Sequence, residues 1–371
     1  MGGVSMETYK LSDLCEILDS KRKPLSALQR AKKQGIYPYY GAQGIIDHLD
    51  EYLLDGEYLL VAEDGANLET RNQPIANIAN GKIWVNNHAH VLGNNGKCPL
   101  NLLGFILNNM NISPYVTGCA QPKLNQENLR NIEIELPSHI DRIASILSSL
   151  DRKIELNNKI NADLEEMAQA IFKNWFVDFE PFKDGKFVDS DLGIIPEGWK
   201  VGLLGELCNF KRGKNLLTKN AIDEGVPVVA GGLEPSCYHN VANTGAPVIT
   251  VSGSGANAGF MRMYHVPVWA SDCSFIDISC ENFYFVYCFL KVNSKLLKHA
   301  QTGAVQPHVK PSDIHDFELV IPDKESIYDF QDKVKPFFDK IASIQKENSR
   351  LSLLRDTLLP RLMSGELEVP E

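Results

Sequence analysis

Two basic segments have the composition of a phosphate-binding surface, since neither contains an acidic residue. The first is SKRKPLSALQRAKK, which begins at Ser20, and the second is FKRGKNLLTK, which begins at Phe210. Clusters of Lys and Arg on one face bind nucleic-acid phosphates. Such a run is more often a solvated loop, but its recurrence favours DNA contact through Lys21, Arg22, Lys23, Lys211, Arg212 and Lys214.

Residues suited to reading bases follow both basic segments. Asn, Gln and Arg can form paired hydrogen bonds with adenine or guanine edges in the major groove. The alternative is that each is a turn residue that satisfies its own backbone. The candidates near the first segment are Tyr39, Tyr40, Gln43, Asn67 and Arg71, and those near the second are Asn257 and Arg262. Lys123, His308 and Lys310 complete the set. The residues that follow Gln121-Pro122 differ from those that follow Gln306-Pro307, as is expected of positions that read different bases.

The usual catalytic signatures are missing from the sequence. GNNGKC lacks the first glycine and the hydroxyl residue of a phosphate-binding loop, and GSGANAG at Gly253 has one residue too many for a dinucleotide loop, so it predicts a tight turn. There is no G-x-S-x-G, H-E-x-x-H, E-x-K, PPY or PPF sequence. The alternating His88 and His90 are more simply ordinary polar residues than metal ligands. The sequence therefore predicts no catalytic residue, no metal site and no bound cofactor.

An internal repeat organises these candidates. TGCAQPKLNQENLRNIEIELP from Thr117 matches TGAVQPHVKPSDIHDFELVIP from Thr302 without a gap, and the same offset of 185 places Trp84 on Trp269. The two GAN sequences, at Gly65 and Gly255, have an offset of 190. The same offset aligns YKLSDLCEI with WKVGLLGEL at the two domain starts. Repeats of this kind predict two similar, mainly β domains.

Each repeat is followed by a heptad pattern of apolar residues, which predicts a helix of roughly 36 residues, about 54 Å long. That length exceeds a compact domain, so the two apolar stripes are expected to bury each other. An antiparallel pair related by a pseudo-twofold axis satisfies this requirement. Asn157, Asn161 and Asn348 lie in these stripes and are expected to form a polar layer that fixes the helix register.

The expected fold class is α+β, with two mainly β target-recognition domains separated by two long antiparallel coiled-coil helices. The domains are residues 1–137 and 199–322, the helices 138–178 and 323–364, the linker 179–198 and the tail 365–371. A net charge of −10 excludes indiscriminate coating of nucleic acid. No apolar run is long enough to cross a bilayer, so we expect a soluble cytoplasmic protein. The eight cysteines have no C-x-x-C spacing and are expected to be reduced and mostly buried.

At this point the sequence resembles a known family along essentially its whole length, the specificity subunits of type I restriction-modification systems. Three stretches carry the resemblance: YPYYGAQGIIDHLDEYLLDGEYLLVAEDGAN, AIFKNWFVDFEPFKDGKFVDSDLGIIPEGW and LRDTLLPRLMSGELEV. The resemblance implies a non-catalytic subunit whose two domains each read half of a bipartite, asymmetric site in double-stranded DNA.

The same resemblance implies several partners. Two methyltransferase subunits that use S-adenosylmethionine would dock along the helices, and restriction and translocase subunits would supply ATP- and Mg-dependent steps. Two alternatives remain open from the residues alone: a coiled-coil scaffold that binds protein but no DNA, and a DNA-modifying enzyme with unfamiliar motifs.

Overall fold

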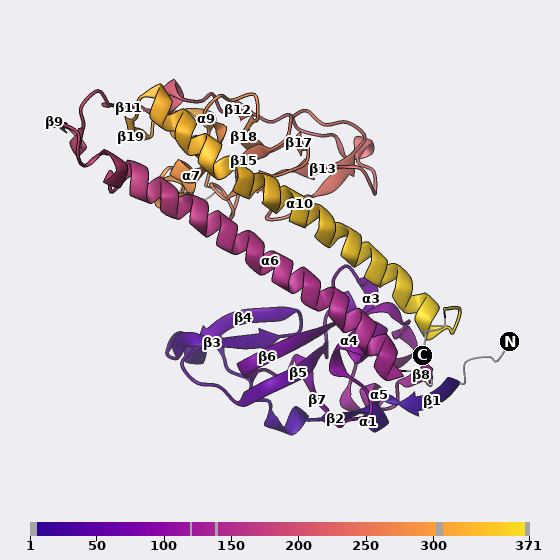
Figure 1. The fold of residues 1–371 in the computed structure, drawn as a ribbon. Helices are drawn as coiled ribbons and strands as arrows, with labels where there is room; N and C mark the ends of the chain where they lie inside the picture. The colour runs from indigo at the N-terminus through magenta and orange to yellow at the C-terminus, as the bar shows by residue number, and fades with distance from the viewer. Residues whose placement is uncertain (1–5, 119–120, 138–139, 302–306, 368–371) are drawn as a thin grey trace. The chain divides into compact units, whose positions relative to one another are not determined.

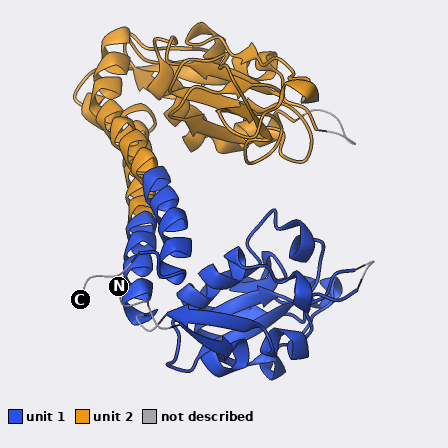
Figure 2. Ribbon diagram, turned by 90° about the vertical axis from the view of Figure 1, so that its right-hand side faces the viewer, with its two compact units in different colours: residues 1–156, 348–371 blue, residues 157–347 orange. Residues whose placement is uncertain are grey.

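The computed structural model describes residues 6–118, 121–137, 140–301 and 307–367 (Figure 1). The chain forms two compact units. Unit 1 comprises residues 1–156 and 348–371, and unit 2 comprises residues 157–347 (Figure 2). Both are β-rich, as the sequence predicts, and both include part of each long helix.

Unit 1 is built on a six-stranded sheet with the strand order β2-β7-β5-β6-β3-β4. All neighbours are antiparallel except β3 and β6, which pair in parallel through Tyr39 and Trp84. The strands are β2 (Cys15–Ile17), β3 (Gln34–Gly41), β4 (Gly44–Leu49), β5 (Leu54–Ala62), β6 (Ala76–Val85) and β7 (Ala89–Asn94). The short helices are α1 (Leu11–Leu14), α2 (Ala27–Ala31), α3 (Asn67–Thr70), α4 (Leu100–Asn109) and α5 (Gln126–Arg130).

Unit 2 repeats this topology with shorter strands. Its sheet β12-β18-β15-β16 corresponds to β2-β7-β5-β6, and its sheet β14-β13-β17 corresponds to the β4-β3-β6 edge. The parallel pair recurs as Val228 opposite Trp269. The strands are β12 (Lys211–Arg212), β13 (Val226–Val229), β14 (Cys237–His239), β15 (Val248–Ser252), β16 (Met261–Tyr264), β17 (Trp269–Ala270) and β18 (Cys273–Asp277). The helices are α7 (Phe283–Val292), α8 (Ser294–His299) and α9 (Pro311–His315).

A two-stranded sheet joins the first and last strands of each domain. In unit 1, β1 (Met6–Lys10) pairs with β8 (Glu133–Pro137), and in unit 2, β11 (Lys200–Leu203) pairs with β19 (Glu318–Ile321). The segments NIEIELP and DFELVIP, which end the two repeats, thus contain the closing strands of the two domains. The linker contributes a hairpin of β9 (Phe187–Ser190) and β10 (Gly193–Pro196).

The predicted alignment of the two domain starts is wrong by three residues. The Leu11 amide donates to the Ile132 carbonyl at 2.8 Å, and the Leu204 amide donates to the Phe317 carbonyl at 2.9 Å, so Leu11 corresponds to Leu204. The thiols of Cys15 and Cys208, four residues later, each donate to the preceding leucine carbonyl. Length differences near the basic segments concealed this offset of 193, which follows from 204 minus 11.

The two GAN turns need their glycines for the same reason. Gly65 has a φ of 111° and Gly255 has a φ of 79°, a region in which side chains with a Cβ are strained. Each glycine amide donates to a proline carbonyl at 3.1 Å, from Gly65 to Pro122 and from Gly255 to Pro307. The predicted tight turn at GSGANAG is confirmed, since it joins β15 to β16.

Two long helices follow the closing strands, α6 (Ile140–Phe176) and α10 (Lys324–Met363). Within unit 2, the end of α6 packs on the start of α10, where Phe172 and Phe176 contact Phe330 with ring centroids 5.7 and 5.2 Å apart. Within unit 1, the start of α6 packs with the end of α10, and Leu147 shares a core with Leu359. The helices therefore run antiparallel, as the heptad pattern predicts.

Polar groups lie within this helix pair. In unit 2, buried Asn157 donates through Nδ2 to Glu347 Oε2 at 2.9 Å. Asn161 Oδ1 is buried and has no hydrogen-bond partner among the described residues. Asn348 belongs to unit 1. The register role of the three asparagines stays a prediction.

The described cysteines agree with the sequence analysis. Seven are free thiols, of which five are buried: Cys15, Cys98, Cys208, Cys273 and Cys288. Burial raises the pKa of the Cys15, Cys98 and Cys273 thiols to about 12. Cys119 lies outside the described residues. The helices of the described ranges include none that is both long and apolar enough to span a bilayer.

Candidate nucleic-acid interface

Arg22 is the centre of a buried ion-pair network in unit 1. Its guanidinium contacts Asp19 at 3.1 Å and Glu63 at 2.5 Å, and its side chain is only 14% exposed. It also donates to the Ala89 carbonyl at 3.0 Å. The structure thus gives Arg22 an internal role, and we leave it out of the proposed interface.

His90 completes this network and explains one of the two histidines in NHAH. Its ring is fully buried, with Nδ1 2.6 Å from Asp19 Oδ2 and Nε2 2.7 Å from the Leu124 carbonyl. Burial alone would raise the pKa of the Asp19 carboxyl. Its hydrogen bond with His90 and the charges of His90 and Arg22 outweigh burial, so the pKa is lowered overall. The pKa of Glu63 is likewise lowered, as burial is outweighed by Arg22, His90 and Lys123.

Asp19, Glu63 and His90 lie close enough to hold a metal ion, with ligand atoms within 4.8 Å of one another. Arg22, however, contacts both carboxylates and already balances their charge. A cation would have to displace the guanidinium. We therefore assign the three residues to an internal network with Arg22.

An acid of β4 and an acid just after it neutralise part of the first basic segment. Arg30 pairs with Asp47 at 2.9 Å, and Lys33 pairs with Glu51 at 2.6 Å. Lys21, Lys23 and Lys32 are exposed, and no ion pair forms at these three lysines within the part of the chain that the structure describes. The accessible cations of this segment are thus fewer than its sequence indicates.

Three of the five base-reading candidates in unit 1 have structural roles. Tyr39 is 1% exposed, and its hydroxyl accepts a hydrogen bond from the Leu25 amide at 2.9 Å. Buried Asn67 closes a loop through two hydrogen bonds with the Gln73 backbone, at 2.9 and 3.0 Å. Tyr40 is partly buried on β3, whereas Gln43 is exposed in the turn between β3 and β4.

Arg71 is the third of these structural residues. Its Nη2 donates to the carbonyls of Leu107 and Asn108, at 2.9 and 2.6 Å, where α4 ends. A guanidinium at this position satisfies carbonyls that lack a helical partner and complements the negative end of the helix dipole. Burial lowers the pKa of Arg71. We therefore assign Arg71 to capping α4.

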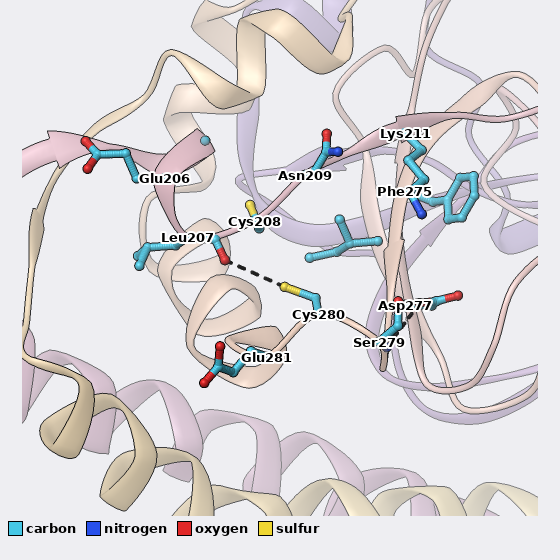
Figure 3. Close-up of a pocket in the computed structure, with 12 residues that line it drawn as sticks. Glu206, Leu207, Cys208, Asn209, Lys211, Phe275, Asp277, Ser279, Cys280 and Glu281 are labelled. Carbon is cyan, nitrogen blue, oxygen red and sulfur yellow. Dashed lines mark hydrogen bonds between the residues drawn. The ribbon is translucent and has the colours of Figure 1, made fainter.

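Within the second basic segment, Lys211 and Arg212 form the short strand β12, so their side chains point to opposite faces. Lys211 lines a cavity of about 430 Å³ together with Glu206, Asp277 and Glu281, among other residues (Figure 3). Arg212 lines a different cavity and pairs with Asp272. Lys214 is exposed, and its carbonyl accepts from the Trp269 indole at 2.8 Å, as the Lys23 carbonyl accepts from Trp84 at 2.7 Å.

The remaining candidates of unit 2 are all at least partly accessible. Arg262 pairs with Glu234 at 2.9 Å and lies over the Tyr264 ring. Asn257 is partly exposed in the GAN turn. His308 and Lys310 line the same cavity as Arg212.

Lys123 and His308 occupy matching places in the two units. A bridge pairs Asp64 with Lys123 in unit 1, and a bridge pairs Ser254 with His308 in unit 2. The flanking hydrogen bonds also match, from the Leu124 amide to the Glu63 carbonyl and from the Val309 amide to the Gly253 carbonyl. One backbone framework thus presents a lysine in one unit and a histidine in the other.

Sequence reasoning missed Asp19 and Glu63, the acids that neutralise Arg22. Asp19 directly precedes the first basic segment, and its spacing of three residues from Arg22 was an available signal for a local ion pair. Glu63 is 41 residues away, so only the fold brings it to Arg22.

Comparisons with known proteins agree with this architecture. The model of the type I restriction modification DNA specificity domain matches residues 3–166 and again residues 196–352. The specificity subunit of the type I restriction enzyme MjaIX from Methanocaldococcus jannaschii is 32% identical over 280 residues, covering 68% of this chain. This chain spans less than two thirds of that relative, 65% of its length.

Two further comparisons support the assignment. The HindI specificity subunit from Haemophilus influenzae is 26% identical over 336 residues, covering 66% of this chain and 71% of that protein. The crystal structure of a type I restriction-modification S subunit from M. genitalium has the same fold, with a TM-score of 0.55 at 18% identity, and the match covers 100% of this chain and 98% of that one. The chain belongs to the family defined by the type I restriction modification DNA specificity domain.

Proposed function

We propose that this chain is the DNA-reading subunit of a type I restriction-modification complex. Each unit reads one half of a bipartite, asymmetric site in double-stranded DNA. A single small domain contacts only a few base pairs, so two joined domains are needed for a site that is rare in a genome. Family membership supports this proposal, since the matching model is that of a DNA specificity domain.

The observation that carries the proposal is the shared framework with unlike side chains. Lys123 and His308 lie at equivalent bridges, and the loop that carries each residue is held by the same hydrogen bonds. Two domains that share one backbone fold but contact different bases are expected to differ in the side chains at such positions and to keep the same backbone hydrogen bonds.

The proposed interface consists of the accessible candidates in each unit. In unit 1 these are Lys21, Lys23, Tyr40, Gln43 and Lys123, and in unit 2 they are Lys211, Arg212, Lys214, Asn257, Arg262, His308 and Lys310. Lysine and arginine would contact phosphates, and the amide and imidazole groups would contact base edges.

The long helices have two proposed roles. They would set the spacing between the half-sites and would dock two methyltransferase subunits. In this proposal the chain itself is non-catalytic and works in the cytoplasm, residues 1–137 and 199–322 are the reading domains, and restriction and translocase subunits join the complex. S-adenosylmethionine, ATP and Mg would then bind to partner subunits.

Sequencing the methylated positions in DNA from cells that express this chain with its methyltransferase partner tests the proposal. A two-part motif with a fixed spacer is the expected result. Methylation that lacks such a motif would refute the reading function. The purified chain alone, supplied with cofactor and DNA, should neither methylate nor cut, whereas an atypical enzyme would do one of the two.

Replacing Lys211, Arg212 and Lys214 with Ala separates DNA reading from a protein scaffold. DNA binding should weaken, and its dependence on salt should become shallower. A scaffold without DNA contact would keep the same methylation pattern and the same partner binding.

A further inference from the structure

The cavity beside Arg212 is lined by two cationic side chains, those of Arg212 and Lys310. It has a volume of about 440 Å³ and is lined by Arg212, Gly253, His308, Lys310, Pro311 and Ser312. Three of the six lining residues carry nitrogen groups that can donate hydrogen bonds to an anion. Lys310 is exposed, and the Arg212 side chain is 45% exposed.

The matching place in unit 1 is already neutralised by carboxylates. The equivalent backbone hydrogen bonds align Gly253 with Glu63. In unit 1, Glu63 contacts Arg22 at 2.5 Å and Lys123 at 3.2 Å, so both cations have an internal partner. Because unit 2 has a glycine there, its cavity lacks this carboxylate.

The second carboxylate of the unit 1 network also has no counterpart. Asp19 lies between Cys15 and Lys23, which correspond to Cys208 and Lys214 in unit 2. The stretch in unit 1 is two residues longer, since 23 minus 15 is 8 and 214 minus 208 is 6. The shorter span, NFKRG, contains no acid. The network of unit 1 therefore cannot form in unit 2.

Gly253 also provides the space for the Arg212 guanidinium. A Cβ at this position would lie 2.2 Å from Nη1 of Arg212. Two carboxylates remain near the cavity. Asp272 pairs with Arg212 and accepts from Ser254, and Asp313 accepts from the Lys310 amide at 2.8 Å. Neither is among the lining residues.

We propose that this cavity binds one backbone phosphate of the DNA half-site read by unit 2, through Arg212 and Lys310 with His308 beside them. The matching place in unit 1 binds a phosphate less readily, because Glu63 already pairs with Arg22 and Lys123, and Asp19 pairs with Arg22. The two units consequently hold the duplex by different phosphate contacts. This inference rests on the proposed function and specifies one of its contacts.

Salt-dependent DNA binding by the chain in complex with its methyltransferase subunits tests the inference. Lys310→Ala should reduce the slope of log K against log salt concentration by about 0.9, the contribution of one phosphate. The matched control is Lys295→Ala, which removes an exposed lysine of α8 that does not line the cavity. Its slope should stay closer to that of the parent chain.

Gly253→Glu provides a second variant, because it installs the unit 1 carboxylate beside Arg212. It should lower affinity and the salt slope in the same direction as Lys310→Ala. The two substitutions together should lose little more than either alone, since both act on one phosphate. Thermal unfolding of each variant verifies that the fold is retained.

Methylphosphonate scanning of the bound DNA identifies the contact. One phosphate in the unit 2 half-site should be sensitive in the parent complex and less sensitive in Lys310→Ala, where Arg212 remains. Sequence-specific binding by the parent with unchanged slopes and scans in the variants would overturn the inference alone. A parent complex without sequence preference would overturn the proposed function and the inference together.

Discussion

The Arg22 guanidinium lies 2.5 Å from the Glu63 carboxylate, although 41 residues separate them in the chain. This contact links the turn after β2 to the end of β5, and it withdraws one predicted DNA ligand into the core of unit 1. In unit 2, Arg212 pairs with Asp272, which is more exposed than Asp19 and Glu63.

Arg22→Ala should destabilise the chain strongly, by about 3 kcal/mol, because it leaves the buried Asp19 carboxylate and the partly buried Glu63 carboxylate without their cation. Arg212→Ala, at a more exposed pair, should cost less than about 1 kcal/mol. Denaturant unfolding of both variants measures the two values. Equal losses would contradict the assignment of Arg22 to an internal network.

Asp19 should make the stability of unit 1 depend on pH. Its pKa is lower in the folded chain than its ordinary value, about 3.9 in an unfolded peptide. The stabilisation is therefore present above about pH 4 and is lost as the pH falls through the lower, folded pKa. Asp19→Asn should be less stable than the parent at pH 7. The difference in unfolding free energy between Asp19→Asn and the parent, measured from pH 3 to 7, should become smaller below about pH 4. A constant difference would refute this linkage.

Arg71→Ala should cost about 2 kcal/mol, because the carbonyls at the end of α4 lose a charged donor. Arg71 has a φ of 53°, which strains any residue with a Cβ. Arg71→Gly should therefore be more stable than Arg71→Ala by about 1 kcal/mol. Hydrogen exchange at the α4 amides measures the local effect. Protection that is unchanged in both variants would argue against capping.

Asn161→Leu should stabilise the helix pair by about 1 kcal/mol, since it removes a buried oxygen without a partner. Ala170→Leu is the control, because Ala170 is exposed on the same helix and its change should stay within about 0.5 kcal/mol. Thermal unfolding compares the two. A destabilised Asn161→Leu chain would instead show that this amide makes a necessary interaction.

Seven residues inserted into each long helix should lengthen the spacer of the methylated motif. The insertions belong after Leu156 and after Glu347, where the chain passes between the units. The gain is up to about 10 Å, or roughly 3 base pairs at 3.4 Å each. Methylation mapping reads the spacer directly. An unchanged spacer in a chain that still methylates DNA would show that the helices do not set it.

The repeat and the long helices could be predicted because their causes are local. Gly65 and Gly255 are required by their own backbone angles, and the heptad stripes are visible in the residue order. The charge balance of the basic segments could not be predicted in this way. Glu63, Asp47 and Glu51 reach Arg22, Arg30 and Lys33 only after the sheet has formed.

Burial was the second limit of the sequence. YPYYGAQG suggests exposed aromatic readers, but Tyr39 pairs with Trp84 in the sheet and enters the core. Neighbouring Tyr40 alternates with it, and no local signal showed which of the two faced inward. Asn67 and Arg71 have the side chains of base readers, yet they bond to backbone groups that the fold brings near.

Unit 1 includes the end of α10, whose Leu359 and Leu362 are buried in its core. Unit 2, by contrast, is one uninterrupted stretch that finishes at Glu347. During translation the ribosome therefore releases every residue of unit 2 before it releases Leu362. Unit 1 is consequently synthesised first, but its core can be completed only after unit 2 has been synthesised. Until then, the part of the unit 1 core that Leu359 and Leu362 cover stays exposed on the nascent chain.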